Sequence, residues 1–136
     1  MIKIGDIEIP DFPLLLAPME DVSDPPFRAL CKEMGADVVY TEFISSEGLI
    51  RNAQKSVIKL DIFEKERPVG IQIFGAKLDS MLQSIDIVEA VSPDIIDINF
   101  GCPVKKVVSK GAGAGILKDI DLMVKLTKEM CRRTSL

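Results

Sequence analysis

Short apolar runs alternate along the chain with longer segments in which apolar residues recur at helical spacing. Uninterrupted apolar runs are typical of strands buried on both faces of a parallel sheet, and the longer segments predict amphipathic helices. The expected strands are residues 14–18, 37–42, 68–75 and 94–100. Four strand–helix units in a row predict an α/β fold in which helices cover a parallel sheet.

Start and stop signals support this division of the chain. Asp24 stands where an N-cap is expected before Pro25-Pro26, and Gly35 follows that helix as a C′ residue. Residues 78–91 carry a clear apolar stripe, and Asp119 or Asp121 caps a final helix. Residues 2–10 predict a small hairpin, and residues 45–60 a mostly helical or irregular stretch.

Polar residues lie at or just past the carboxyl end of each expected strand. They are Glu20, Glu42, Gln72, and then Asn99 with Cys102. Such a gathering is typical of the active-site face of a (β/α)8 TIM barrel. A doubly wound sheet usually has a glycine-rich phosphate turn after its first strand, and the turn after residues 14–18 contains no glycine. The pattern therefore favours the barrel.

The length of 136 residues is about half of what a complete barrel of roughly 250 residues needs. We therefore expect residues 1–136 to be the N-terminal half of a barrel, with the C-terminal half absent. Four strands alone leave two unpaired sheet edges, so another copy or another half is expected to cover them.

Composition narrows the chemistry further. Apolar residues make up 47% of the chain, no apolar run approaches the ~18 residues of a membrane span, and no secretory signal is recognisable, so we expect a cytoplasmic protein. The chain has no histidine, which excludes a catalytic triad and a histidine-ligated zinc within these residues. Three cysteines at wide spacing form neither a disulfide framework nor a CxxC motif, so we expect thiols and no metal.

Cys102 is the candidate for acid chemistry. It stands between Gly101 and Pro103 at a strand end, and a thiol is one of the few groups that can donate a proton near neutral pH. An ordinary cysteine packs as a small apolar residue, and that is the interpretation for Cys31 and Cys131 in their helical patterns. The rigid Gly-Cys-Pro turn favours a functional thiol at Cys102.

The net charge of −4 hides a basic tract. Residues 101–118 contain Lys105, Lys106, Lys110 and Lys118 and no acid, whereas 13 basic and 21 acidic residues lie elsewhere. Such a loop could bind phosphates, or it could be an ordinary solvated loop. The glycines at 111, 113 and 115 could line an anion with their N–H groups, although such runs are common in loops.

Two polar residues have open interpretations. Gln72 lies on an otherwise apolar strand and must find hydrogen-bond partners, either in a flat heterocycle or in neighbouring protein groups. Arg28 reads first as a surface charge of the helix that Pro25 opens.

Three strings, in order, resemble the tRNA-dihydrouridine synthase family. The string APMEDVSDPPFR at residues 17–28 resembles the family's opening signature, and QIFG at residues 72–75 resembles its third-strand motif. The string DINFGCP at residues 97–103, followed by two lysines and the Gly-Ala-Gly run, resembles the catalytic stretch. The resemblance extends over essentially the whole chain.

The resemblance implies a TIM barrel with a separate helical domain that uses FMN and NADPH to reduce uridines in tRNA to 5,6-dihydrouridine. In the family, hydride from the flavin reaches C6 of the uracil and the cysteine of Gly-Cys-Pro, here Cys102, protonates C5. The expected flavin contacts are Pro18, Met19, Glu20 and Gln72. The expected contacts with uracil and tRNA are Asn99, Lys105, Lys106 and Arg28.

The match also has departures. Glu20-Asp21 stands where relatives more often have small residues, and the family's later flavin lysine, phosphate loops and helical domain would lie beyond Leu136. We therefore expect the 136-residue chain alone neither to retain FMN nor to reduce tRNA. Two alternatives are a flavin barrel that acts on a free small molecule, and a catalytically inactive half-barrel that associates with itself.

Overall fold

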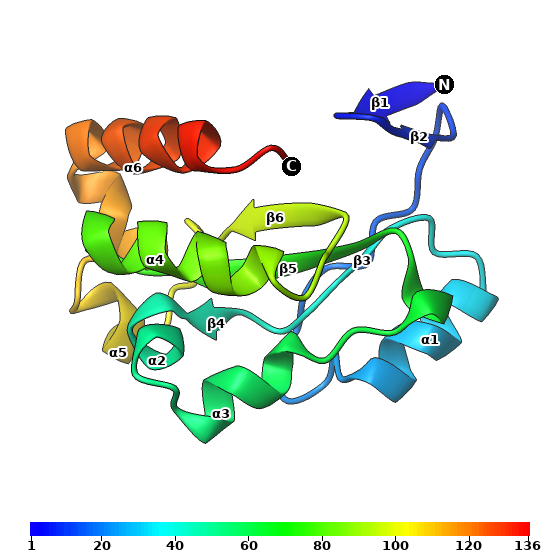
Figure 1. Cartoon of the computed structure of the whole chain (residues 1–136), viewed down its shortest axis with the longest axis horizontal. Helices are drawn as coiled ribbons and strands as arrows, with labels where there is room; N and C mark the ends of the chain where they lie inside the picture. Colours follow the sequence, from blue (N-terminus) through cyan, green and yellow to red (C-terminus); the bar gives the residue numbers. More distant parts are fainter.

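The computed structural model describes residues 1–136 and shows an α/β fold with a parallel sheet (Figure 1). The strands are β1 Ile2–Ile4, β2 Ile7–Ile9, β3 Val39–Tyr40, β4 Ile44–Ser45, β5 Val69–Phe74 and β6 Ile95–Ile98. The α-helices are α1 Pro25–Glu33, α2 Ser46–Ile50, α3 Gln54–Val57, α4 Leu78–Glu89, α5 Lys105–Val108 and α6 Ile120–Arg133. Short 3-10 helices are η1 Ile58–Leu60, η2 Glu64–Glu66 and η3 Gly113–Lys118.

Strand β5 is the centre of the four-stranded sheet. On one side it pairs in parallel with β3 through Val39 and with β4 through Ile44, so β3 and β4 are two parts of one interrupted strand. On the other side β5 pairs in parallel with β6, and Gln72 lies opposite Asp97. Strand β4 lies at the start of the stretch for which the sequence predicted helical or irregular structure.

The first expected strand, residues 14–18, is reduced to a single bridge. Leu15 bridges Val38 in parallel, and Leu16 N donates to Val38 O at 2.9 Å. The prediction of a full strand is therefore wrong here, because this segment has a hydrogen-bonding partner on one side only. Leu14 and Leu15 are exposed rather than buried on both faces.

The predicted helix ends and the hairpin are confirmed. Asp24 Oδ1 accepts a hydrogen bond from Phe27 N at 3.0 Å at the start of α1, and Gly35 follows the C-cap of that helix. Asp119, rather than Asp121, caps α6 by accepting from Leu122 N at 3.0 Å. Strands β1 and β2 form the predicted antiparallel hairpin.

The core lies between the sheet and helices α4 and α6, which lie side by side in Figure 1. Ile71 and Ile73 of β5 are fully buried there with Met81 and Ile85 of α4. Because side chains alternate along a strand, Gln72 points to the opposite face of the sheet. The helical face supplies the apolar contacts, and the other face is free to carry polar groups.

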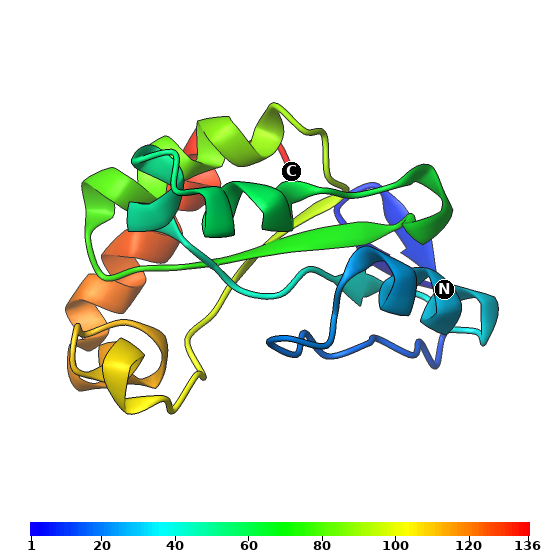
Figure 2. The ribbon, with the colours of Figure 1, turned by 90° about the horizontal axis from the view of Figure 1, so that it is seen from below.

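The 136 residues do not close a barrel. Strand β6 pairs with β5 alone, and the hairpin and α5 lie at opposite ends of the molecule (Figures 1 and 2). The α/β class and the parallel sheet are thus confirmed, while the assignment of this sheet to the N-terminal half of a TIM barrel stays a prediction. No helix has both the length and the apolar character that crossing a membrane requires.

Candidate functional site

A chain of side-chain hydrogen bonds crosses from β5 to β6 on the polar face of the sheet. Gln72 Nε2 donates to Asp97 Oδ2 at 2.6 Å. Asn99 Nδ2, just past the end of β6, donates to Gln72 Oε1 at 3.0 Å. Gln72 is only 7% exposed, so neighbouring protein groups satisfy the amide that the sequence left without a partner.

The chain of hydrogen bonds ends on the turn that carries Cys102. Asn99 Oδ1 accepts from Gly101 N at 3.2 Å and from Cys102 N at 2.9 Å. Cys102 is a half-buried free thiol that immediately precedes Pro103. The side chain of Asn99 therefore holds the backbone on which the candidate proton donor sits, and Gln72 in turn holds Asn99.

A second contact supports the same turn from the glycine run. Ala114 N donates to Cys102 O at 3.0 Å. Gly113 has a φ of +54°, and a Cβ there would lie 2.7 Å from Cys102 O. Glycine is needed at this position because both the backbone conformation and the close approach disfavour a side chain. The structure gives Gly113 a packing role against Cys102.

The basic tract continues from this turn. Lys105 and Lys106 are exposed on α5, immediately after the Cys102 turn, and Lys110 and Lys118 are also exposed. No salt bridge engages any of the four. The structure therefore leaves these positive charges accessible, and Lys105 and Lys106 lie nearest to the candidate proton donor in the chain.

The predicted flavin contacts after the first strand lie in an exposed turn. Pro18 is half-buried, Met19 is 38% exposed, and Met19 N donates to Ser23 Oγ at 2.9 Å. Glu20 pairs with Lys59, with 2.6 Å between Oε1 and Nζ. One carboxylate oxygen each of Glu20, Asp21 and Glu42 lies within 4.8 Å of the others, so negative charge collects here.

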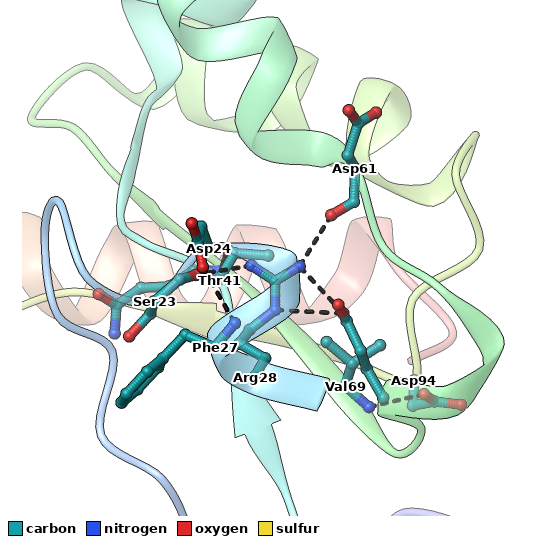
Figure 3. A network of polar contacts seen from close by, with 10 residues as sticks. Ser23, Asp24, Phe27, Arg28, Thr41, Asp61, Val69 and Asp94 are labelled. Carbon is teal, nitrogen blue, oxygen red and sulfur yellow. Dashed lines mark hydrogen bonds and ion pairs between the residues drawn. The ribbon is translucent and has the colours of Figure 1, made fainter. Parts of the chain in front are cut away.

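Arg28 does not lie at the surface as the sequence suggested. It is 2% exposed, and its Nε and Nη2 donate to Glu66 Oε2 at 3.1 and 2.9 Å. Nη1 donates to Ser23 O at 2.7 Å and Nη2 to Asp61 O at 2.8 Å (Figure 3). The placement of Arg28 toward tRNA is thus corrected, because its guanidinium is committed to groups inside the protein. The arginine ties α1 to the segment around η2.

Tyr40 of β3 lies close to the side-chain hydrogen bonds that join Gln72 and Asp97. Burial, followed by the negative charge of Asp97, raises the pKa of its phenol above the ordinary value of about 10. The ring occupies the space over Gly70, where an added Cβ would lie 2.4 Å from Tyr40 Cδ1. The same carboxylate therefore affects both Gln72 and Tyr40.

Two residues of this arrangement received no role from the sequence. Asp97 fixes one end of the Gln72 amide, and Thr41 Oγ1 accepts from Gln72 N at 3.2 Å. The signal for Asp97 was its place two residues before Asn99, since the two then point to the same face of a strand. Its pairing with Gln72 depends on the sheet register, which the sequence does not display.

Comparison with known proteins identifies the family of this chain. The family model described as dihydrouridine synthase (Dus) matches residues 15–136. The chain is 43% identical over 118 residues to a probable tRNA-dihydrouridine synthase of Aquifex aeolicus. These 118 residues are 85% of this chain and 37% of that protein. The chain is 35% identical over 132 residues to tRNA-dihydrouridine synthase B of Pseudomonas aeruginosa, or 97% of this chain and 40% of that protein.

A third relative agrees with these two. A probable tRNA-dihydrouridine synthase of Rickettsia prowazekii is 39% identical over 127 residues, which cover 93% of this chain and 38% of that protein. The chain thus spans 37–40% of the length of these three relatives. Because the match covers almost all of the 136 residues, including the Asn99–Cys102 turn, the chain belongs to the dihydrouridine synthase (Dus) family.

Proposed function

We propose that the protein takes part in the FMN- and NADPH-dependent reduction of specific tRNA uridines to 5,6-dihydrouridine. The observation that carries this proposal is the Cys102 turn, held through Asn99 and Gln72 at the carboxyl end of β6, in a chain of the dihydrouridine synthase family. Membership of the family supports the reaction class, and the turn supports the assignment of the acid.

Gln72 suits the edge of a flavin ring. Its Nε2 carries a second hydrogen besides the one donated to Asp97, and its Oε1 has a second lone pair besides the one that accepts from Asn99. The proposal adds Pro18, Met19 and Glu20 from the turn after residues 14–18 as flavin contacts. When bound beside these residues, FMN would supply the hydride for C6 of the uracil, with NADPH as the reductant.

Cys102 then supplies the proton for C5. The thiol S–H bond breaks, the proton is added to C5, and the thiolate that remains is reprotonated from solvent. Asn99 orients the uracil, because its Nδ2 keeps one hydrogen beyond the bond to Gln72 for a base oxygen. The C5–C6 double bond is thus reduced by one hydride and one proton.

Lys105 and Lys106 are proposed to bind tRNA phosphates beside this site. Their charges are exposed on α5, three and four residues after Cys102 in the chain. The target uridine must leave its base stack to reach the thiol, and phosphate contacts on both sides of it help to hold the displaced nucleotide. Arg28 has no part in this contact because it is buried.

We further propose that the parallel sheet is the N-terminal part of a TIM barrel, and that the protein works in the cytoplasm. Successive parallel strands with polar groups at their carboxyl ends support the barrel. Barrel enzymes place their active sites at that end of the strands, which is where Asn99 and Cys102 lie.

Deletion of the gene that encodes this chain tests the function. Position-by-position mapping of dihydrouridine in the cell's tRNAs should show that a defined set of sites changes from dihydrouridine to uridine. Reintroduction of the unmodified gene should restore those sites. If every dihydrouridine survives the deletion, the proposed function is wrong.

A further inference from the structure

We propose that Asp97 is a positioning residue that sets the direction of the hydrogen-bond chain ending at Cys102. The inference concerns the arrangement of the turn, and its catalytic meaning rests on the function proposed above. Asp97 does not contact the Cys102 turn itself. It acts through Gln72 and Asn99, whose amides can each be turned in two ways.

The direction is set at the carboxylate. A carboxylate accepts hydrogen bonds and donates none, so Asp97 selects the Nε2 side of the Gln72 amide. With Nε2 turned toward Asp97, Oε1 of Gln72 must face Asn99. An amide at residue 97 could accept or donate, and both orientations of Gln72 would then be compatible with a hydrogen bond.

The orientation of the Gln72 amide determines the orientation of the Asn99 amide, which contacts the Cys102 turn. Since Oε1 of Gln72 accepts, Asn99 must offer Nδ2 to it and keep Oδ1 on the other side. There Oδ1 accepts from two backbone N–H groups, those of Gly101 and Cys102. If Asn99 were reversed, its NH2 group would face two donors, and the turn would lose both hydrogen bonds.

The surrounding protein keeps the hydrogen bonds between Asp97, Gln72 and Asn99 from rearranging. Gln72 is 7% exposed, so water has little access to replace its partners. The register of β5 against β6 places Gln72 directly opposite Asp97, and Gln72 N is held by Thr41 Oγ1 at 3.2 Å. Asp97 itself is half-buried on the same face of the sheet. The backbone therefore fixes the distances, and the carboxylate fixes the direction.

Hydrogen exchange at single amides of the 136-residue chain tests the proposal. With Asp97→Asn, the amides of Gly101 and Cys102 should exchange on the order of fivefold faster, the effect of losing about one hydrogen bond. Asp94→Asn is the matched control. Asp94 Oδ2 accepts from Val69 N at 2.8 Å at the opposite end of the same strand pair, and its loss should leave the Cys102 amide unchanged.

A double variant separates direction from simple structural support. In Asp97→Asn with Gln72→Glu, the amide at 97 donates to a carboxylate at 72, which can only accept from Asn99 Nδ2. The direction at Asn99 is restored, so protection of the Cys102 amide should return. The midpoint of urea unfolding, measured for every variant, shows whether a change is global or confined to the turn.

The outcomes are distinct. Unchanged exchange in Asp97→Asn, or a double variant no better protected than the single one, would overturn the proposal. If a variant does not fold, the unmodified chain still decides: a strong nuclear Overhauser effect from the Asn99 side-chain NH2 to the Cys102 amide proton would also overturn it. None of these measurements uses dihydrouridine formation, so a failure of the proposed function would be seen separately, in the gene deletion.

Discussion

Tyr40, Gln72 and Asp97 bring three kinds of polar side chain together on one face of the sheet. The carboxylate of Asp97 accepts from Gln72 and lies close enough to Tyr40 to oppose ionisation of the phenol. Polar groups that are wholly or partly buried this close together depend on one another, because removing one partner leaves the others unsatisfied or changes their charge balance. A substitution of Asp97 should therefore affect both Gln72 and Tyr40.

The titration of Tyr40 should show the effect of Asp97 directly. Tyr40 is the only tyrosine and tryptophan is absent, so the ultraviolet change on phenolate formation reports this residue alone. The midpoint should lie above the ordinary pKa of about 10 and fall in Asp97→Asn, although burial, the larger cause, should keep it raised.

The sign for stability follows from the raised pKa. Stability linked to the neutral phenol is fully present below the ordinary pKa and is lost as the pH rises through the folded-state pKa of Tyr40. Asp97→Asn should weaken this alkaline dependence. A Tyr40 midpoint that Asp97→Asn leaves unchanged would contradict the proximity of the two side chains.

Among the elements, α1 and η2 are joined by the buried pair of Arg28 and Glu66. The two side chains are 2% and 1% exposed, and Glu66 Oε1 has no hydrogen-bond partner. The guanidinium of Arg28 therefore compensates the buried negative charge of Glu66. Removing one member of such a pair leaves an uncompensated buried charge.

Arg28→Ala should therefore lower the free energy of unfolding by about 3–5 kcal/mol, measured by urea denaturation. Arg132→Ala is the control, since Arg132 pairs with Glu129 at the surface and should cost less than about 1 kcal/mol. If Arg28→Ala costs no more than this control and instead weakens tRNA binding, the surface role that the sequence suggested would be right.

The contact of η3 with the Cys102 turn can be tested by comparing two glycines, Gly111 and Gly113. Gly111 and Gly113 both have positive φ, but a Cβ at Gly111 meets nothing closer than 3.6 Å, whereas one at Gly113 would lie 2.7 Å from Cys102 O. Alanine in the left-handed region costs about 1–2 kcal/mol at either site. Gly113→Ala should cost more than Gly111→Ala in urea unfolding, and equal losses would show that the contact with Cys102 O is unimportant.

In the molecule as a whole, local signals in the sequence predicted most helices and strands. The elements that were predicted wrongly or missed depend on pairings between segments far apart in the sequence. Asp24, Gly35 and Asp119 mark helix ends through their own neighbours in the chain, so those ends were predictable. The segment 14–18 lacks a second neighbouring strand, and a continuous apolar run does not reveal this. Ser45 ends β4 and also caps α2, so this short strand was hidden next to a helix signal.

The same distinction applies to the site. Gln72 was found because it is a polar residue within an apolar strand, and Asn99 and Cys102 because they follow the end of a strand. The structure joins the three. The partners of Arg28 and Gln72 were not found, because Glu66 is 38 residues from Arg28 and Asp97 is 25 residues from Gln72. Such pairings are set by packing and by sheet register, which no local pattern records.

The basic tract allows a prediction about tRNA binding. The combined change Lys105→Ala and Lys106→Ala should weaken tRNA binding at all salt concentrations and reduce the slope of log affinity against log salt by roughly 0.7–0.9 for each lost phosphate contact. Lys128→Ala removes an exposed lysine of α6 and serves as the control. Equal slopes for the pair and the control would exclude the tract as a phosphate contact.

The central claim is that Cys102 donates the proton in the reduction of tRNA uridine. Its most direct test is the dihydrouridine map of tRNA from cells in which the gene for this chain carries Cys102→Ala, compared with Cys131→Ala, which changes an exposed cysteine of α6. The account predicts that Cys102→Ala removes dihydrouridine at the sites that the gene deletion removes, while Cys131→Ala retains it. Undiminished dihydrouridine in the Cys102→Ala cells would contradict the account.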